Sequence, residues 1–445
     1  MQPQTSDLET DQQPPLSLPF AHFLAGAVLL LVGGGIAGLG PLVLPIEANS
    51  VATLHLLLAG WIGLTIMGAM VQFVPVWSGT RLYSENFSLY SLQLVLIGVA
   101  SIAGVFLLRA YELFPIAAGV LLIGFWLFAY VIFRTLPTLS DLDITEAHFF
   151  MAVLSLLVAT AAGWLLATDF SYRLLDTLPV SRQGVLLSHL TLTVFGFVSL
   201  TIVGALYQLG PMFTQAPAST IDSSLAAVEM IALPFGVVLL ATSRLFGLLD
   251  PARVGASLLL GGMLAFALVL LRRLRDAQVE LGPMLRRYWL VGLSVVGWVL
   301  LSVPPWLSDP LGYFYRFGSQ QATHLLFIGL FTITIVGTFY HVVPFIIWFH
   351  EYSDKLGYEP VPMIDDMYDS RLAYVEFWLL VLGLGTLWAA EFIGAPTWTL
   401  MLGGNVFGAG VILFAINMGL VVSRHRPETL TEVYRLLTFR GDARP

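Results

Sequence analysis

Apolar segments of membrane-spanning length recur along this chain, and they constrain its fold more than any other feature. A bilayer core of about 30 Å needs about 20 apolar residues in helical form, and in lipid only helices and closed barrels satisfy every backbone polar group. About twelve segments reach this length. They cover residues 20–42, 51–76, 87–108, 113–134, 147–168, 183–211, 223–247, 253–274, 285–305, 319–349, 372–391 and 398–422. The sequence therefore predicts an all-α polytopic membrane protein.

The composition agrees with burial in lipid and narrows the available chemistry. Hydrophobic residues make up 57% of the chain and charged residues 11%, about half the charged fraction of a soluble domain. The net charge of -8 is spread over loops and tails, so we expect the lipid bilayer and not nucleic acid as a partner. The chain has no cysteine, which excludes disulfides, thiolate metal sites and cysteine-linked heme.

Lys and Arg residues are distributed unevenly between the predicted loops. With a cytoplasmic N-terminus, fourteen of them fall on inner loops or the C-terminal tail and six on outer loops. Arg287 is counted here as an inner and Arg244 as an outer loop residue. Because positive charge normally accumulates on the cytoplasmic side, we expect both termini inside, in an integral protein of a prokaryotic-type cell membrane.

A repeated pattern divides the predicted helices into three groups of four. The second helix of each group carries Thr-Ile-X-Gly, then a polar residue four positions and a proline seven positions after the glycine. The three copies have Gly68, Gln72 and Pro75; Gly204, Gln208 and Pro211; and Gly337, His341 and Pro344. Another glycine precedes each motif glycine by eight residues. Such spacing also permits close helix packing in lipid, but three copies in one register favour a threefold internal repeat over the halves of common transporters.

The repeat predicts the division of the chain. The first eighteen residues are polar, rich in Gln and Pro and free of basic residues, so we expect a disordered tail. The predicted regions are an N-terminal tail at 1–18, four-helix repeats at 19–140, 141–278 and 279–423, and a cytoplasmic C-terminal tail at 424–445.

Histidines stand at matched repeat positions toward the predicted outer face. His55 and His324 each lie thirteen residues before the motif glycine, and in the middle copy Thr191 holds that position with His189 nearby. An ionisable group inside a membrane is costly unless it is paired, and two facing imidazoles are what a low-spin heme iron needs. We predict His55 and His324 as axial ligands of a b-type heme and His189 as a further cofactor-binding candidate. The alternative for each is a hydrogen bond to a neighbouring carbonyl or hydroxyl.

A second group of polar residues lies toward the predicted inner face. Imidazole and carboxylate together suit copper, non-heme iron or zinc and can also relay protons. For the histidines that begin helices, the alternative is helix capping or hydrogen bonding to lipid headgroups. The candidates for a second metal site are His341, His22 and His148, with Glu229 and Glu376.

In its twelve predicted helices, its threefold repeat and the positions of His55 and His324, the chain resembles the heme-copper oxidase subunit I superfamily. This superfamily includes oxygen reductases and nitric oxide reductases. That family has twelve helices in three arcs of four, and the resemblance implies low-spin heme ligands at His55 and His324. Residues 55–60 (HLLLAG) and 74–79 (VPVWSG) are also similar to the NnrS family of membrane heme proteins linked with nitric oxide stress.

The sequence departs from the oxidase pattern at the second metal centre. An oxidase has His-x-His on the tenth helix, whereas Ala322 stands two residues before His324 here. The consecutive histidine pair at the seventh helix is also absent, because residues 223–247 contain no histidine. A conventional heme-copper binuclear centre is therefore not expected.

Together these features predict a membrane b-type hemoprotein that transfers electrons or binds or reduces a diatomic gas, nitric oxide or oxygen. As an enzyme, it would be an oxidoreductase related to cytochrome oxidase or nitric oxide reductase subunit I, served by a redox partner subunit or electron donor. Two alternatives stay open. One is a cofactor-free transporter or channel for a metal, a proton or a small solute; the other is an assembly factor for heme or copper.

Overall fold

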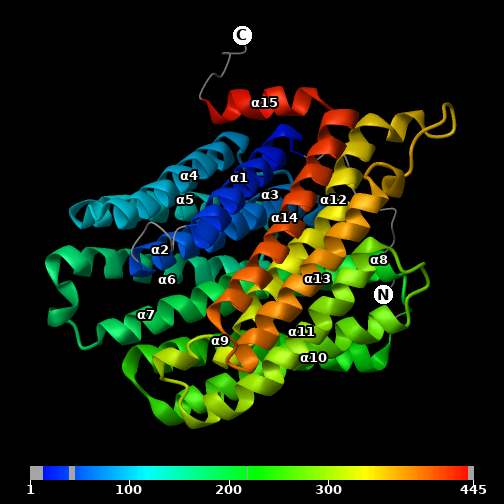
Figure 1. Ribbon diagram of the computed structural model, residues 1–445. Coiled ribbons are helices and arrows are strands. Elements are labelled where there is room, and N and C mark those ends of the chain that lie inside the picture. The colour runs from blue at the N-terminus through cyan, green and yellow to red at the C-terminus, as the bar shows by residue number, and fades with distance from the viewer. Residues whose placement is uncertain (1–13, 40–45, 218, 439–445) are drawn as a thin grey trace. The chain divides into compact units, whose positions relative to one another are not determined.

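The computed structural model describes residues 14–39, 46–217 and 219–438, and these residues form helices and no β-strand (Figure 1). Within these described residues, twelve helices are long and apolar enough to cross a membrane. The chain is therefore an all-α polytopic integral membrane protein, and the predicted fold class is confirmed. The spans are Ser17–Ala37, Ser50–Ser78, Glu85–Leu108, Tyr111–Thr135, Ile144–Tyr172, Arg182–Thr214, Thr220–Phe246, Leu249–Arg275, Pro283–Ser308, Leu325–Glu351, Ser370–Phe392 and Thr397–His425.

Some spans contain more than one helical element. The longer elements are α1 (Ser17–Leu39), α2 (Ile46–Leu54), η3 (His55–Ile62), α3 (Gly63–Ser78), α4 (Glu85–Leu108), α5 (Phe114–Thr135), α6 (Ile144–Tyr172), α7 (Arg182–Thr191), η6 (Leu192–Ser199), α8 (Leu200–Thr214), α9 (Thr220–Phe246), α10 (Leu249–Arg275), α11 (Pro283–Ser308), η9 (Leu325–Thr332), α12 (Ile333–Glu351), α13 (Ser370–Phe392), α14 (Thr397–His425) and α15 (Glu428–Leu437). Short 3-10 turns occur in the loops between them.

The predicted N-terminal tail differs from expectation where the structure describes it. Residues 1–13 lie outside the described part of the chain. Leu16 and Leu18 are buried, and α1 already begins at Ser17, so the predicted tail at 1–18 was too long. Leu16 and Leu18 pack into the protein, and the first helix therefore begins before the predicted residue 20. The predicted C-terminal tail contains the amphipathic helix α15.

Polar side chains cap the helices where they leave the loops. Ser84 accepts a hydrogen bond from the Phe87 N–H at the start of α4, and Asp143 and Glu146 form a capping box at the start of α6. Asp369 caps α13, and the hydrogen bonds that it accepts from backbone N–H groups lower the pKa of its carboxyl. These caps satisfy N–H groups that have no partner within the helix.

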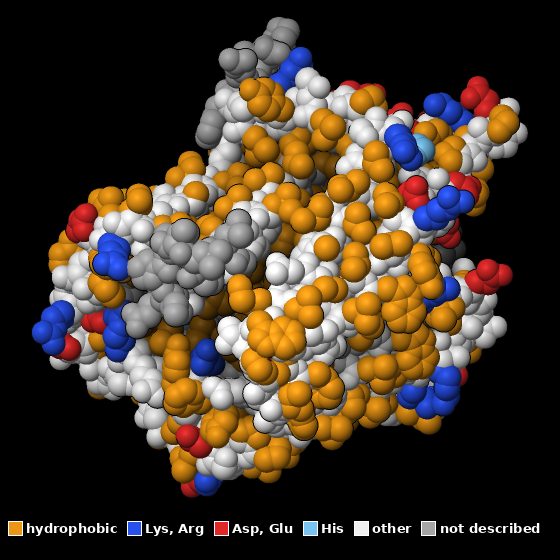
Figure 2. All heavy atoms as spheres, in the orientation of Figure 1, with side chains coloured by type: hydrophobic (Ala, Val, Ile, Leu, Met, Phe, Trp, Pro, Cys, Tyr) orange, Lys and Arg blue, Asp and Glu red, His pale blue; other side chains and the backbone are white. Residues whose placement is uncertain are grey.

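Hydrophobic side chains cover much of the surface drawn in Figure 2. Large apolar residues are exposed in the middle of several spans, among them Ile97 in α4, Ile123 in α5 and Leu154 in α6. In water such surfaces would favour aggregation. They fit the hydrocarbon of a bilayer, as the span lengths require.

The second helix of each predicted group of four contains an eight-residue π-helical segment. These segments, η3, η6 and η9, begin thirteen, twelve and twelve residues before the motif glycines of their helices. The hydroxyls of Ser199 and Thr332, at matching positions, each donate to the carbonyl five residues earlier, 2.9 Å away. Long π-helical segments are rare and frequently occur at functional sites.

The motif glycines form the same helix contact in all three groups. Each packs against one polar residue of the preceding long helix, so closely that a Cβ atom on the glycine would come within 2.5–3.2 Å of that residue's Cβ. The pairs are Gly68 with His22, Gly204 with His148, and Gly337 with Arg287. The upstream glycines repeat the pattern seven residues farther along the partner helix, pairing Gly60 with Leu29, Gly196 with Ser155, and Gly329 with Ser294.

The third and fourth helices of each group also meet through matched glycines. The glycine on the fourth helix packs against a residue that lies three positions before a glycine of the third helix. The pairs are Gly124 with Val95, Gly262 with Leu233, and Gly410 with Leu380. Close approach of this kind brings backbones together in lipid, where dispersion contacts drive helix association.

The chain divides into two compact units. Unit 1 comprises residues 1–207, 234–255 and 432–445, and unit 2 comprises residues 208–233 and 256–431. In unit 1, α4 packs along α5; in unit 2, α13 packs along α14 (Figure 1). These units are defined by contacts in space, and their boundaries differ from those of the predicted four-helix repeats. The repeats at 19–140, 141–278 and 279–423 remain a prediction from the sequence.

Candidate functional site

His55 is the first residue of η3, directly after α2 in unit 1. Its Nδ1 lies 2.9 Å from the carbonyl oxygen of Val51, one turn earlier, and its ring stacks against Phe106 with centroids 6.5 Å apart. A carbonyl can only accept a hydrogen bond, so Nδ1 carries the proton. The lone pair is then on Nε2, where it can bind a metal.

His324 occupies the matching repeat position in unit 2, immediately before η9. Its Nδ1 lies 2.7 Å from Oε2 of Glu391, a residue near the end of α13. The carboxylate accepts from Nδ1 of His324 as the carbonyl of Val51 does for His55, so Nε2 is again the ring nitrogen that could bind a metal. Sequence reasoning assigned no role to Glu391, because the contact joins residues 67 positions apart.

His189 in α7 belongs to unit 1, as His55 does. Its Nδ1 lies 2.7 Å from the carbonyl oxygen of Ala159 in the neighbouring helix α6, and a Cβ atom at Gly163 would come within 3.0 Å of its Cε1. The structure therefore places these two predicted cofactor-binding residues in one unit.

At the repeat position of His55 and His324, the middle group has Thr191. Thr191 is fully buried and accepts a 2.8 Å hydrogen bond from Nη1 of Arg244. Arg244 is 2% exposed within α9, so its assignment to an outer loop was wrong. A hydroxyl shields its charge from hydrocarbon, as burial requires.

His22 and His148, both in unit 1, are completely buried at the start of α1 and α6. Each ring bonds through Nδ1 to the carbonyl four residues earlier, at 2.9 Å for His22 and 2.6 Å for His148. Hydrogen bonding to lipid headgroups, the alternative for these residues, is therefore wrong. The buried Nε2 of His22 has no hydrogen-bond partner among the described residues.

His341 lies in unit 2 between two aromatic rings. Its centroid is 4.7 Å from that of Phe213 and 6.0 Å from that of Phe345, with which it is nearly parallel. Among the described residues, no group of three or more His, Asp or Glu side chains is gathered as a metal site. The inner metal site that combines His341, His22, His148, Glu229 and Glu376 remains a prediction.

Glu376 forms an ion pair with Arg287 inside unit 2, and both side chains are completely buried. Arg287 also donates to the carbonyls of Pro283 at 2.7 Å and Ala373 at 3.0 Å, and its guanidinium lies 4.5 Å from the ring centroid of Tyr340. The assignment of Arg287 to an inner loop was therefore wrong. One oxygen of Glu376 is engaged by arginine, while Oε1 has no partner among the described residues.

Glu229, the other carboxylate of the predicted inner site, is completely buried in α9. It occupies the position in the second group that Glu376 occupies in the third, since each stands seven residues before a glycine. Buried carboxylates in membrane helices are rare and mark candidate functional positions.

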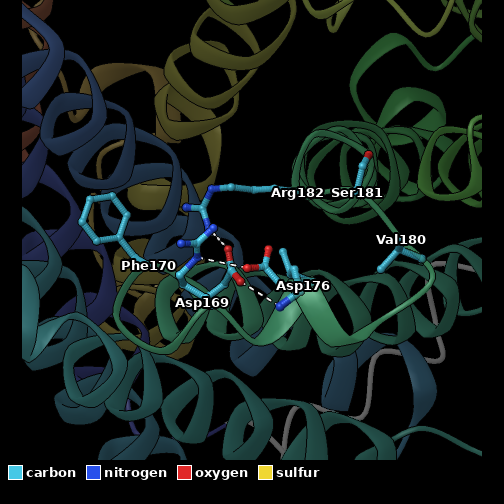
Figure 3. A pocket seen from close by; sticks show the side chains of 8 residues that line it. Asp169, Phe170, Asp176, Val180, Ser181 and Arg182 are labelled. Carbon is cyan, nitrogen blue, oxygen red and sulfur yellow. Dashed lines mark hydrogen bonds and ion pairs between the residues drawn. The ribbon is translucent and has the colours of Figure 1, made fainter.

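A cleft of about 470 Å³ lies where α6 leads into α7 (Figure 3). Asp169 and Arg182 form an ion pair of 2.5 Å across it, and the Leu175 N–H donates to the same carboxylate at 2.8 Å. The cleft holds none of the predicted site residues. Its ion pair ties together the two helices that carry Ala159 and His189.

The chain matches no protein-family model and no curated protein.

Proposed function

We propose that this chain is a membrane b-type hemoprotein of heme-copper oxidase-like fold, with His55 and His324 as the axial ligands of the heme. Its task is electron transfer, or the binding and reduction of nitric oxide or oxygen, without a conventional heme-copper centre. Both termini lie in the cytoplasm of a prokaryotic-type cell. The single observation that carries the proposal is that both histidines, at one repeat position, bond through Nδ1, which leaves Nε2 as the nitrogen to bind iron.

The donor set of these two residues fits a low-spin heme. Imidazole nitrogen is a common axial ligand, and its second nitrogen usually donates to a carbonyl or carboxylate that fixes the ring. His55 has the carbonyl of Val51 in this role, and His324 has the carboxylate of Glu391. When bound, the heme would supply reversible one-electron exchange.

Gas reduction requires a metal with an open coordination position, which an iron with two axial imidazoles lacks. In this proposal the inner residues His341, His22 and His148 are the candidates to hold copper or non-heme iron, supported by Glu229 and Glu376. The buried, unpaired Nε2 of His22 is the observation that favours a ligand there, because buried polar atoms are normally hydrogen-bonded.

The test is the absorption spectrum of the purified protein, oxidised and dithionite-reduced, from cells supplied with heme. We expect the sharp reduced bands of a low-spin b-type heme, lost or converted to a high-spin form in His55→Ala and in His324→Ala. His350→Ala is the matched control, because His350 also bonds through Nδ1 to the carbonyl four residues earlier but stands outside the site. A colourless wild-type protein would refute the proposal and favour a transporter or channel.

A further inference from the structure

The histidines of this protein differ in the acceptor that Nδ1 faces. His22, His55, His148 and His350 face the carbonyl one turn earlier in their own helix, and His189 faces a carbonyl of the next helix. Among the histidines that the structure describes, His324 is the one whose Nδ1 meets a carboxylate.

The two partners of this contact come from separate elements of unit 2. His324 immediately precedes η9, and Glu391 is the next-to-last residue of α13. Their side chains are 27% and 31% exposed, and 2.7 Å separates Nδ1 from Oε2. The backbone of Glu391 also takes part in the end of α13, because the Gly394 N–H donates to its carbonyl at 3.4 Å. The carboxylate is thus held by a helix end and not by a mobile loop.

A carboxylate acts on an imidazole more strongly than a carbonyl does. The hydrogen bond to a charged acceptor is shorter and about twice as strong as a neutral one. It draws the Nδ1 proton toward the oxygen and leaves more electron density on Nε2, which raises the basicity of the ligand. A more basic ligand stabilises ferric over ferrous iron and so lowers the reduction potential.

We propose that Glu391 is a positioning residue, which orients the His324 ring and strengthens its Nε2 as a metal donor. This inference rests on the proposed heme ligation by His324. Glu391 therefore sets the potential at which the heme exchanges electrons.

The test compares the heme midpoint potential and the heme-to-protein ratio of wild type, Glu391→Gln, Glu391→Ala and Glu391→Asp. Glu391→Gln keeps a hydrogen-bond acceptor without charge, so we expect retained heme with a more positive midpoint. Glu391→Ala removes the acceptor, and we expect heme affinity to fall about 10- to 100-fold. Glu391→Asp keeps the charge and should restore a midpoint closer to that of wild type.

Glu112→Gln is the control, because it removes one exposed carboxylate from a loop that the topology places on the same side of the membrane. Its midpoint should match that of wild type. A heme-containing wild type whose midpoint is unchanged by Glu391→Gln overturns the role of Glu391 and leaves the proposed function standing. A wild type that binds no heme overturns both. Size-exclusion chromatography of each variant separates loss of heme from loss of fold.

Discussion

At the scale of single residues, the Arg287–Glu376 pair is the most demanding feature of the structure. Both charges are fully buried in unit 2, and transferring a charge from water into the protein interior costs several kcal/mol even after relaxation. Carbonyls of two helices and the ring of Tyr340 surround the guanidinium. The pair thus joins α11 to α13 through contacts that neither partner could lose singly.

We expect Glu376→Ala to destabilise the protein by about 3–5 kcal/mol, because it leaves the Arg287 charge buried without compensation. The double variant Arg287→Met with Glu376→Leu should recover most of that loss, since apolar replacement of a whole buried pair is often neutral. Denaturant unfolding in detergent micelles measures both effects. Equal stability of wild type and Glu376→Ala would show that the pair contributes nothing.

The sequence predicted where the histidines lie but not which residues they contact, and the reason is physical. The position of His55 and His324 follows from local register, which the repeated glycines make visible. The partners Glu391 and Ala159 depend on tertiary contacts between distant segments, for which the sequence has no short-range signal. Arg287 was taken as a loop residue because a charge usually marks the end of a span. Its seven-residue spacing to Ser294, which matches that of His148 and Ser155, was the available signal.

At the scale of elements, the length of each apolar segment was enough to predict the twelve spans. In lipid the backbone N–H and C=O groups must bond to one another, and a helix does this within one segment. The π-helical segments η3, η6 and η9 were not predicted. Their residues are as apolar as those of ordinary helices, so neither composition nor periodicity distinguishes them. Their recurrence near the same repeat position ties this helix geometry to the histidines beside it in two of the three groups.

The glycine contacts give a prediction within one helix, α8. Gly204→Ala places a Cβ atom 2.5 Å from the Cβ of His148, whereas the same change at Gly210 meets nothing within 4 Å. Overpacking of this kind costs about 1–3 kcal/mol, so we expect Gly204→Ala to lower the unfolding temperature. Gly210→Ala should leave it unchanged or raise it, because alanine favours helix over glycine. Equal unfolding temperatures for the two variants would contradict the packing.

At the scale of the whole molecule, burial of Arg244 and Arg287 changes the charge count that set the proposed topology. Removing one residue from each side leaves thirteen Lys and Arg on the inner and five on the outer segments. The asymmetry keeps its sign, so the proposal of cytoplasmic termini still follows from the count.

The absence of cysteine from the sequence makes this topology directly testable. We expect Glu112→Cys, in a predicted outer loop, to react with a membrane-impermeant maleimide in intact cells. Tyr358→Cys, at a position that is 90% exposed in a predicted inner loop, should react only after the cells are permeabilised. Labelling of Tyr358→Cys alone in intact cells would show that the orientation is reversed. Labelling of both variants in intact cells would place both positions outside and would require an even number of spans between them.

The contact beneath the motif glycines has a consequence for how this chain can be studied. The same packing contact is made by two kinds of side chain in one polypeptide, the imidazoles of His22 and His148 and the guanidinium of Arg287. Exchanging these residues between groups would compare an imidazole with a guanidinium in three settings that share the same helix contact, the same expression level and the same lipid. The effect of a substitution at one of the three glycine contacts can therefore be compared with the effect of the same substitution at the other two.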